Sequence, residues 1–406
     1  MNARLRRSCT LFSICILAFF LFTDCTSQVS ELPEQFRNLE NLSIHSANEE
    51  PEVAVSFQEE AVYGLSDEIF IGMIQDIAIG PSGRVFIADI QNRSIYVFEP
   101  EGKFTTQLGR GGKGPGEFGI IKSLQIRGDI LYVFEPDRNQ VSLFELDSLA
   151  FKRMTLLAGN RGEFGELDKS APWIRDLLIR SGQTYLAGFN IYPNPTEYKL
   201  WQNVDSKILF YLLDDAGKIS SKKLFDVFSP HTFTGPLVVN INVFFGSPIV
   251  VVSSQNKIYV SDASEFLIKV YHADGVYEHA FYYPNPNIPL TRESIENGGI
   301  MNTHFRPEFL LEHLESMELP RYWPVINDMI MDDENRLWIA TTVGDMSIFE
   351  WWVVEETGEL ITKFEWPRNE QIKVVKNGYM YTRKTEEETG LQTIVKYQVE
   401  MNEKLE

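Results

Sequence analysis

The chain has 406 residues, of which 44% are hydrophobic and 13% aromatic, so it can bury a large folded core. Its 57 acidic and 37 basic residues give a formal net charge of −20, which repels phosphate backbones. This composition excludes a disordered polyanion and leaves no basic surface for nucleic acid, so no nucleic-acid partner is expected.

The first residues have the pattern of a secretory signal peptide. Basic residues at positions 4, 6 and 7 precede an apolar run at 11–22 that is too short to span a bilayer comfortably. The tetrapeptide Phe22-Thr23-Asp24-Cys25 then resembles the lipobox of bacterial lipoproteins, in which the cysteine receives the lipid after cleavage. Asp24 departs from the small residue usual at its position, so an ordinary signal peptide or an anchor flank is the alternative.

We therefore predict a signal peptide at 1–24 and lipidation of Cys25. The protein is expected to be an exported, membrane-anchored lipoprotein of the cell envelope, periplasmic or at the surface, whose only membrane contact is the lipid. The three cysteines, Cys9, Cys15 and Cys25, all lie in or directly after this segment, so the mature domain has no disulfide and no cysteine ligand for a metal. Residues 31–50 are polar and aperiodic, which predicts a flexible tether over 25–52.

From residue 53 the chain repeats a unit of short strands. In each unit an apolar strand is followed by a turn containing Gly or Asn and by a second strand rich in aromatic or β-branched residues. Six such pairs occur, at 77–88, 124–133, 178–187, 251–260, 330–339 and 374–381. Two further strands usually follow each pair. The pattern predicts an all-β fold, a six-bladed β-propeller over 53–400, with a C-terminal tail at 401–406.

The last unit lacks a fourth strand, whereas the run from Val53 to Leu65 has strand composition and no blade of its own. We expect this N-terminal strand to complete the sixth blade, because ring closure removes open sheet edges. The six units, the glycine-rich segment at 109–118 and the N-terminal cysteine motif together resemble the bacterial family of six-bladed β-propeller proteins, relatives of NHL and TolB-like propellers. The resemblance implies a fold for 53–400 but no activity, because that family is largely uncharacterised.

Long insertions interrupt the repeat at 192–205, 229–246 and 284–324, whereas the turns between first and second strands are all short. Because strand direction alternates, the insertions emerge on one side of the propeller, the insertion face, and the short turns lie on the opposite side, the turn face. Long loops on one face of a rigid scaffold are typical of a binding surface. The insertion between blades four and five, at 284–324, contains a predicted helix from Pro307 to Met317, which either packs statically on the blade rims or moves as a lid.

The segment 109–118 contains Gly-x-Gly-x-x-Gly but leads into a strand, which excludes a dinucleotide-binding fingerprint. Lys113 is followed by Gly114 rather than Ser or Thr, so a P-loop is excluded as well. We expect a loop on the insertion face in which Arg110 and Lys113 either contact an anion or are solvated charges on a structural turn.

Three blades begin their innermost strand with an aspartate: Asp76, Asp176 and Asp328. A partial acidic ring at the channel mouth can hold a divalent cation or a cationic ligand group; alternatively, each carboxylate accepts hydrogen bonds from loop amides. Arg138 and Asn139 lie in a polar loop on the same side, where they line a groove or solvate the rim. The candidate ligand-binding residues are Arg110, Lys113, Arg138, Asn139, Asp76, Asp176 and Asp328.

No catalytic motif is present, because the histidines form neither His-Glu-x-x-His nor His-x-His and no Gly-x-Ser-x-Gly occurs. The sequence favours a non-catalytic envelope protein that needs no cofactor and binds a glycan, peptide or protein partner on the insertion face. The alternative is a metal-dependent propeller lactonase or lyase with a divalent cation near the channel mouth. A purely structural scaffold is the third hypothesis, and it predicts no small ligand.

Overall fold

The structure, a computed structural model, describes residues 33–65, 69–168, 173–191, 202–232, 244–296, 312, 314–386 and 388–403. The chain divides into two compact units, Met1–Asn38 and Leu39–Glu406. The 3-10 helix η1 (Glu34–Phe36) belongs to the first unit. The predicted signal peptide and Cys25 lie outside the described residues.

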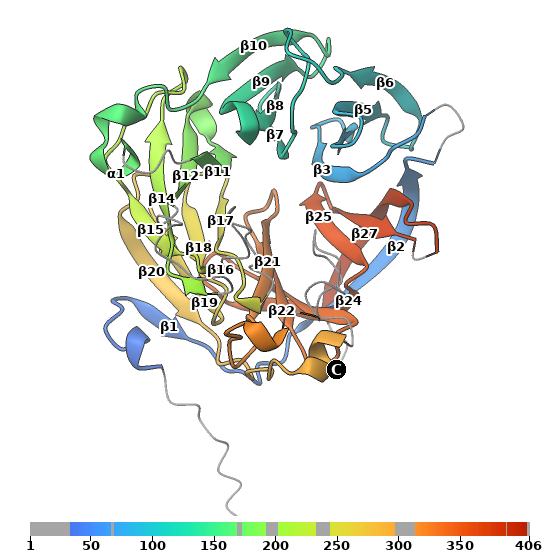
Figure 1. Ribbon diagram of the computed structural model, residues 1–406. Coiled ribbons are helices and arrows are strands. Elements are labelled where there is room, and N and C mark those ends of the chain that lie inside the picture. The colour runs from blue at the N-terminus through green and yellow to red at the C-terminus, as the bar shows by residue number, and fades with distance from the viewer. Residues whose placement is uncertain are drawn as a thin grey trace, which may run out of the picture. The chain divides into compact units, whose positions relative to one another are not determined.

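The unit Leu39–Glu406 is built on a ring of six β-sheets, so the predicted six-bladed propeller is confirmed (Figure 1). Blade 1 contains β3 (Ile74–Ile79), β4 (Val85–Asp89), β5 (Ser94–Phe98) and β6 (Phe104–Leu108). Blade 2 contains β7 (Ser123–Arg127), β8 (Ile130–Glu135), β9 (Gln140–Glu145) and β10 (Phe151–Leu156). Blade 3 contains β11 (Trp173–Ile179), β12 (Tyr185–Ile191), β14 (Lys207–Leu213) and β15 (Phe225–Phe228).

The remaining blades complete the ring. Blade 4 contains β17 (Ile249–Val252), β18 (Ile258–Ser261), β19 (Leu267–Tyr271) and β20 (Tyr277–Tyr282). Blade 5 contains β21 (Ile326–Met331), β22 (Leu337–Thr342), β23 (Ile348–Val354) and β24 (Leu360–Pro367). Blade 6 contains β25 (Glu370–Lys376), β26 (Tyr379–Thr385), β27 (Gln392–Glu403) and β2 (Val53–Tyr63). The first strand of each blade borders the central channel (Figure 1).

Helices are few and short in the described part of the chain. In and after blade 2 they are η2 (Pro136–Arg138), η3 (Arg161–Glu163) and α1 (Gly165–Asp168), and η4 (Ser181–Gln183) lies in blade 3. Between blades 4 and 5 the described helices are α2 (Arg292–Ser294) and η8 (Leu314–Ser316). Most of the predicted helix from Pro307 to Met317 lies outside the described residues. Among those residues, no helix is both long and apolar enough to cross a membrane.

The turns between first and second strands adopt the backbone conformation that their sequences predict. Each contains a residue with positive φ, as at Gly83, Gly128, Gly182, Asn256, Asn335 and Asn377. Glycine takes this conformation without steric cost and asparagine with little, so these residues allow a tight reversal. The Asn377-Gly378 pair, with φ of 55° and 75°, joins β25 to β26 in two residues.

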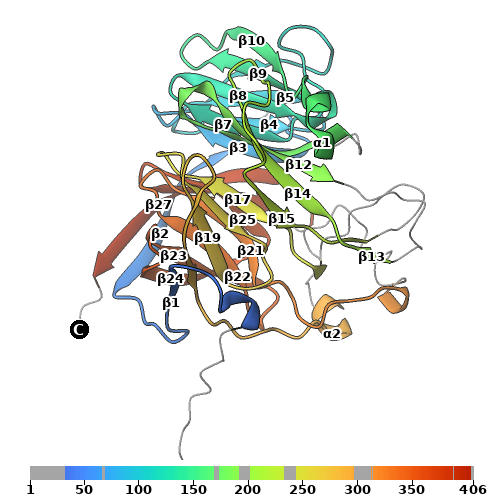
Figure 2. The same cartoon turned by 90° about the vertical axis from the view of Figure 1, so that its left-hand side faces the viewer.

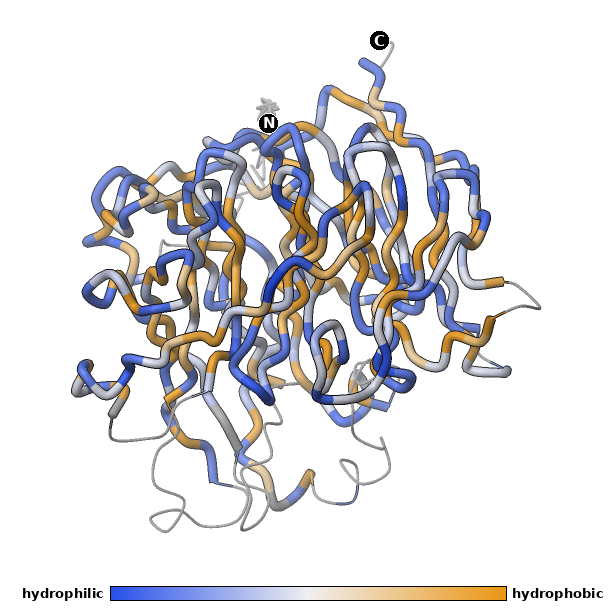
Figure 3. The backbone as a smooth tube through the Cα atoms, turned by 90° about the horizontal axis from the view of Figure 1, so that it is seen from above, coloured by the Kyte–Doolittle hydropathy of each residue, from blue (hydrophilic) through white to orange (hydrophobic). Residues whose placement is uncertain are grey.

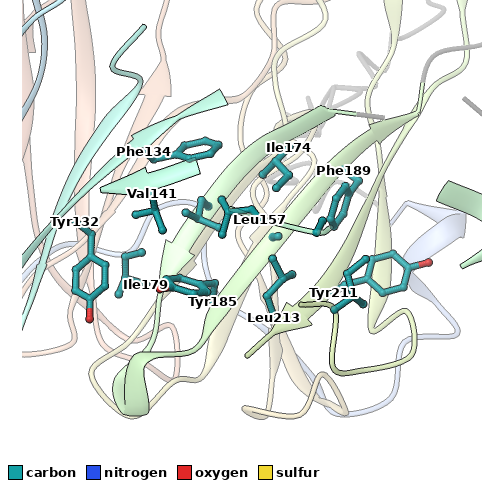
Figure 4. Packing of buried hydrophobic residues seen from close by; sticks show 14 of the residues in the cluster. Tyr132, Phe134, Val141, Leu157, Ile174, Ile179, Tyr185, Phe189, Tyr211 and Leu213 are labelled. Atoms are coloured by element: carbon teal, nitrogen blue, oxygen red, sulfur yellow. The ribbon is translucent and has the colours of Figure 1, made fainter. Parts of the chain in front are cut away.

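Hydrophobic side chains fill the space between neighbouring blades. Hydrophobic stretches run along the strands, and hydrophilic stretches gather in the connecting loops (Figure 3). Between blades 2 and 3, Phe134 and Val141 from one blade pack with Tyr185 and Phe189 from the next (Figure 4). Each such cluster joins two sheets, so the ring is stabilised by blade-to-blade packing rather than by one central core.

The ring closes as predicted, because β2 pairs with β27 in an antiparallel ladder that runs from Val53↔Glu403 to Tyr63↔Ile394 (Figure 1). Tyr63 is fully buried, and its hydroxyl donates to the carbonyl of Pro100 at 2.6 Å. Strand β2 therefore belongs to blade 6 and contacts blade 1 at its end. Because β27 extends to Glu403, the predicted C-terminal tail at 401–406 begins as strand rather than as a free end.

Residues 39–50, which were expected to belong to a flexible tether, contain a strand that pairs with blade 4. Strand β1 (Leu42–Ile44) pairs in parallel with β20 and gives blade 4 a fifth strand. The Tyr277 hydroxyl donates to the carbonyl of Glu40 at 2.7 Å, and the ring of His45 stacks on Tyr283 with centroids 4.7 Å apart. The physical reason is that β1 covers the outer edge of blade 4, whose unpaired backbone groups offer a template for pairing.

Candidate functional site

The three insertions form a connected structure on the insertion face beside blades 3 to 5, which we call the cap. Its described residues are 202–204, 229–232, 244–246, 288–296 and 314–323. Figure 2 shows β13 and α2, which belong to the cap, projecting together on the right-hand side. Strand β13 (Asn203–Val204) pairs with β16 (His231–Thr232), and the Asn203 amide donates to the carbonyl of Glu318 at 2.7 Å. These contacts join all three insertions.

An apolar cluster holds the cap to blade 5. It contains Phe244, Ile295, Leu314 and Trp323 from the insertions together with Met346 from the loop between β22 and β23. Leu314 belongs to the segment predicted as a helix, and its burial favours static packing over a moving lid. The Trp323 indole also donates to the Ser294 hydroxyl at 2.9 Å, which fixes α2.

Asp76 lies directly after a β-bulge in β3. One of its carboxylate oxygens accepts a hydrogen bond from the backbone N–H of Leu124 at 2.8 Å, and the other lies 3.6 Å from the Lys373 ammonium. Because Leu124 is in blade 2 and Lys373 in blade 6, this carboxylate connects blade 1 to both of its neighbours.

Asp176 follows the equivalent bulge in β11. Its Oδ1 lies 3.2 Å from Nζ of Lys122, which also donates to the carbonyl of Arg175. Its Oδ2 lies 3.6 Å from Nε of Arg175. Lys122 precedes the inner strand of blade 2, so this second group of charges connects blades 2 and 3.

Asp328 follows the bulge in β21, and its Oδ1 accepts a hydrogen bond from the backbone N–H of Met329 at 2.9 Å. The side chain of Gln371 in blade 6 also bonds to this carboxylate. Burial raises the pKa of Asp328 above its ordinary value, and the nearby charge of Asp76 raises it further, whereas Lys373 and the two hydrogen bonds oppose the shift.

The three aspartates are thus matched by lysines or by hydrogen-bond donors. Asp76 and Asp328 both accept a backbone N–H, which is the structural alternative that the sequence left open. Among the described residues, no three His, Cys, Asp or Glu side chains are grouped as metal ligands. The carboxylates of Asp76 and Asp176 thus pair with lysines of neighbouring blades.

The glycine-rich segment 109–118 is organised by Glu117. Its Oε2 accepts from the backbone N–H groups of Lys113 at 3.0 Å and Gly114 at 2.9 Å, and its Oε1 accepts from Nε of Arg110 at 2.9 Å. The Gly114 amide and the Arg110 guanidinium lower the pKa of Glu117. The side chain of Arg110 is 79% exposed, and Lys113 is exposed too, so both cations remain open to solvent.

Arg138 holds this segment from the neighbouring polar loop. Its guanidinium donates to the carbonyls of Gly112 and Glu117, and it lies 3.4 Å from the buried carboxylate of Glu135. Asn139 follows with a φ of 46°, and its side-chain oxygen is buried without a hydrogen-bond partner among the described residues. Arg110, Lys113 and Arg138 therefore gather where blades 1 and 2 meet. Asp76 and Asp328 both lie near Lys373, whereas Asp176 pairs with Lys122 and Arg175.

A cavity of about 150 Å³ opens on the insertion face between blades 5 and 6. Asp328 is the one predicted site residue that lines it. The full lining comprises Asn327, Asp328, Phe349, Trp351, Pro367, Arg368, Glu370, Gln371 and Ile372. The lining thus combines two aromatic rings with amide groups and charges of both signs.

Arg368 supplies the positive charge of this cavity. Its Nε donates to the carbonyl of Ile348 at 2.9 Å, and its guanidinium lies 4.2 Å from the centroid of the Phe349 ring. Burial lowers the pKa of Arg368 to about 10, although the charge of Asp345 opposes the shift, so the side chain is a cation at neutral pH. Glu370 supplies a negative charge. Its carboxylate accepts hydrogen bonds from the hydroxyls of Thr382 and Tyr397, each at 2.7 Å.

Sequence reasoning did not find Arg368, Gln371 or the two aromatic residues. Arg368 lies in the connection between blades 5 and 6, directly after Pro367, and no motif marks it. Phe349 and Trp351 are part of an ordinary aromatic strand. One usable indication was present: polar residues that alternate with apolar ones in an inner strand, such as Gln371 and Lys373 in β25, face the channel or a neighbouring blade rather than a core.

Comparison with known proteins identifies the fold. A sequence family described as "6-bladed beta-propeller" (DUF5128) matches residues 65–171. A search of curated proteins found no match. A solved structure from Bacteroides fragilis, described as an exported protein, has 12% identity and a TM-score of 0.50, covering 89% of this chain and 99% of that chain.

Other solved propellers are similar over most of their length. A DUF4221 family member from Bacteroides vulgatus has 11% identity and a TM-score of 0.53, covering 88% of this chain and all (100%) of that chain. Virginiamycin B lyase from Staphylococcus aureus has 12% identity and a TM-score of 0.40, covering 86% of this chain and 99% of that chain. The chain is therefore a six-bladed β-propeller, similar in fold to the two Bacteroides proteins.

Proposed function

We propose that this protein is a non-catalytic binding protein of the cell envelope that captures a glycan, peptide or protein partner on the insertion face. The observation that carries the proposal is the cavity between blades 5 and 6. It combines the carboxylate of Asp328 and the guanidinium of Arg368 with the rings of Phe349 and Trp351. Ligand sites typically have such a composition, in which apolar walls contact the ligand and a few polar groups orient it.

The size of the cavity limits the ligand to one polar group at a time. Its volume of about 150 Å³ corresponds to roughly five water molecules, which suits one sugar ring or one amino-acid side chain. A longer glycan or peptide would insert one unit there and extend across the insertion face. Charges of both signs favour a polar group over a lipid chain.

Charged residues around the channel mouth hold neighbouring blades together, which makes the surroundings of this cavity rigid. The carboxylates of Asp76 and Asp176 are held by Lys373 and Lys122 from neighbouring blades, and Arg138 holds the glycine-rich segment. Because these side chains are already held in place, less conformational entropy is lost when a ligand binds. Arg110 and Lys113, which stay exposed, extend the candidate surface toward blades 1 and 2 for a larger partner.

The proposed location is outside the cytoplasm, with Cys25 as a lipid anchor. The basic and apolar N-terminal residues and the lipobox-like tetrapeptide support export. The similar Bacteroides fragilis propeller is described as exported, which agrees with this proposal.

The proposal is tested by binding to immobilised glycan and peptide panels, followed by calorimetric titration of the strongest binder. We expect Asp328→Asn and Gln371→Ala to weaken its Kd at least about tenfold, or about 1.4 kcal/mol. Glu334→Lys on the turn face, where the side chain is 61% exposed, is the matched control and should bind normally. Binding lost in the control and kept in Asp328→Asn would contradict the proposal, and no binding to either panel would favour the scaffold hypothesis.

A further inference from the structure

A second cavity occupies the half of the central channel that opens on the turn face. It has a volume of about 310 Å³ and is lined by the ends of inner strands from blades 1, 2, 4, 5 and 6. Two cations line it, Arg127 at the end of β7 and Lys376 at the end of β25, and both side chains are half-buried.

The hydrogen bonds of these two cations end on backbone carbonyls. Nζ of Lys376 donates to the carbonyl of Ile79 at 2.8 Å. Nε of Arg127 donates to the carbonyl of Ile179 at 3.2 Å, and its Nη2 reaches the carbonyls of Val252 and Ser253 at 3.5 Å each, the outer limit for a hydrogen bond. Arg127 therefore extends from blade 2 past blade 3 to blade 4. Within the described residues, neither cation forms an ion pair with a carboxylate.

The two acidic residues of the cavity are engaged elsewhere. Asp332 bonds to the Arg336 guanidinium at 2.7 Å and the Trp338 indole at 3.0 Å, and Asp333 accepts from the backbone N–H of Asn377. Burial lowers the pKa of both Lys376 and Arg127, and the charge of Arg127 lowers that of Lys376 further, although Asp333 partly offsets this. The two cations thus share a confined space with too little negative charge nearby.

Packing does not require cations at these positions. Arg127 and Lys376 end the ladder between the first two strands of blades 2 and 6, and their side chains reach toward the following blade. The residues that end the same ladder in blades 1, 4 and 5 are Gly80, Ser253 and Asp332. In blade 3 the residue is Arg180, which donates to the carbonyl of Ala273 and does not line this cavity. The charge of Arg127 and Lys376 costs desolvation without improving the ring, so a ligand that supplies the missing negative charge would explain it.

We propose that the turn-face half of the channel is a binding site for a small oxyanion, a phosphate, sulfate or carboxylate group, held between Arg127 and Lys376. Arginine presents a fork of N–H donors to such a group, and the lysine ammonium adds a point charge. The cavity holds the volume of about ten water molecules, so it accommodates either a free oxyanion or one carried by a small molecule. This site lies at the opposite end of the channel from the cavity at Asp328.

Calorimetric titration of the full mature protein with inorganic phosphate and with sulfate, at constant ionic strength in chloride, tests the proposal. Titration with glycerol phosphate as a third probe separates a free anion from an ester. We expect saturable binding to the wild type and at least a tenfold weaker Kd in Arg127→Gln and in Lys376→Met. Lys376→Met keeps the length and the apolar stem of the side chain and removes only its charge, so it should fold. Lys218→Gln removes an exposed lysine on the same face and should bind as the wild type does.

A second measurement uses the unmodified chain and so does not depend on the folding of a variant. Phosphate at low millimolar concentration should slow the acetylation of Lys376, read by mass spectrometry, and leave Lys218 unaffected. The low concentration avoids the general stabilisation of proteins by phosphate and sulfate. Absence of saturable binding by the wild type, or equal binding by Arg127→Gln and Lys376→Met, would overturn the proposal, as would acetylation of Lys376 that phosphate does not slow.

Discussion

Replacing Tyr63 with alanine should destabilise the whole propeller, because this side chain joins the first and last blades. Tyr63 lies at the end of β2 and is fully buried, with its ring 5.9 Å from that of Phe98 in blade 1 and 6.5 Å from that of Tyr381 in blade 6. Truncating a buried aromatic residue costs about 3–5 kcal/mol. Tyr63→Phe keeps the ring but leaves the Pro100 carbonyl without its donor, at a cost of about 1 kcal/mol.

Urea unfolding followed by tryptophan fluorescence measures these differences. The control is Ile44→Ala in β1, since Ile44 is 57% exposed and its truncation should cost less than about 0.5 kcal/mol. Deletion of residues 53–65, which removes β2 from its ladder with β27, should lower stability even more than Tyr63→Ala. If Tyr63→Ala cost no more than Ile44→Ala, the N-terminal strand would not be what closes the ring.

Three further predictions concern the anchor, the channel mouth and the glycine-rich segment. Cys25→Ala should release folded protein from the membrane fraction, and a wild type that is wholly soluble would remove the lipoprotein proposal. Burial raises the pKa of Asp328 in the folded state, so this carboxyl favours folding at low pH and its contribution is lost as the pH rises through that pKa. Asp328→Asn should therefore raise Tm at pH 8, on the order of 1–2 °C for a domain of this size, and an unchanged or lower Tm at pH 8 would refute this assignment. Arg138→Ala should speed amide hydrogen exchange in residues 109–118, because the carbonyls of Gly112 and Glu117 lose their donor; unchanged exchange would show that the segment is held by Glu117 alone.

The repeat was readable from the sequence because local chemistry determines it. A glycine or asparagine in each tight turn, between two alternating strands, allows only a narrow range of backbone conformations, and Asn377-Gly378 shows how closely turn and sequence agree. Ring closure also followed from the sequence, since residues 53–65 had strand composition and one blade lacked a strand. The turns depend on local sequence alone, whereas the pairing of β2 with β27 was inferred from the strand that the last blade lacked.

Strand β1 was not predicted because its pairing depends on a distant edge. Leu42-Ser43-Ile44 is a three-residue segment in a polar stretch, and it becomes a strand only because β20 offers an open edge beside it. The described end of the predicted helix at 307–317 is the 3-10 helix η8, and most of the remaining residues lie outside the described part of the chain, so the helix as a whole stays a prediction.

The candidate site was predicted in part, and for a similar reason. The inner-strand aspartates were recognisable from their repeated position, but their partners Lys373, Lys122 and Gln371 come from neighbouring blades. Arg368 enters the cavity from a connection between blades that carries no motif. Which residues meet across a blade interface is decided by the three-dimensional arrangement of the ring, which local patterns do not encode.

Hydrogen–deuterium exchange of the full mature protein, with and without the strongest binder from the glycan and peptide panels, locates the ligand on the propeller. We expect the ligand to protect the segments that line the cavity between blades 5 and 6, at residues 326–328, 348–351 and 367–372. Protection confined to the turn face, for example at residues 80–84 and 128–129, with no change in those segments, would contradict this expectation.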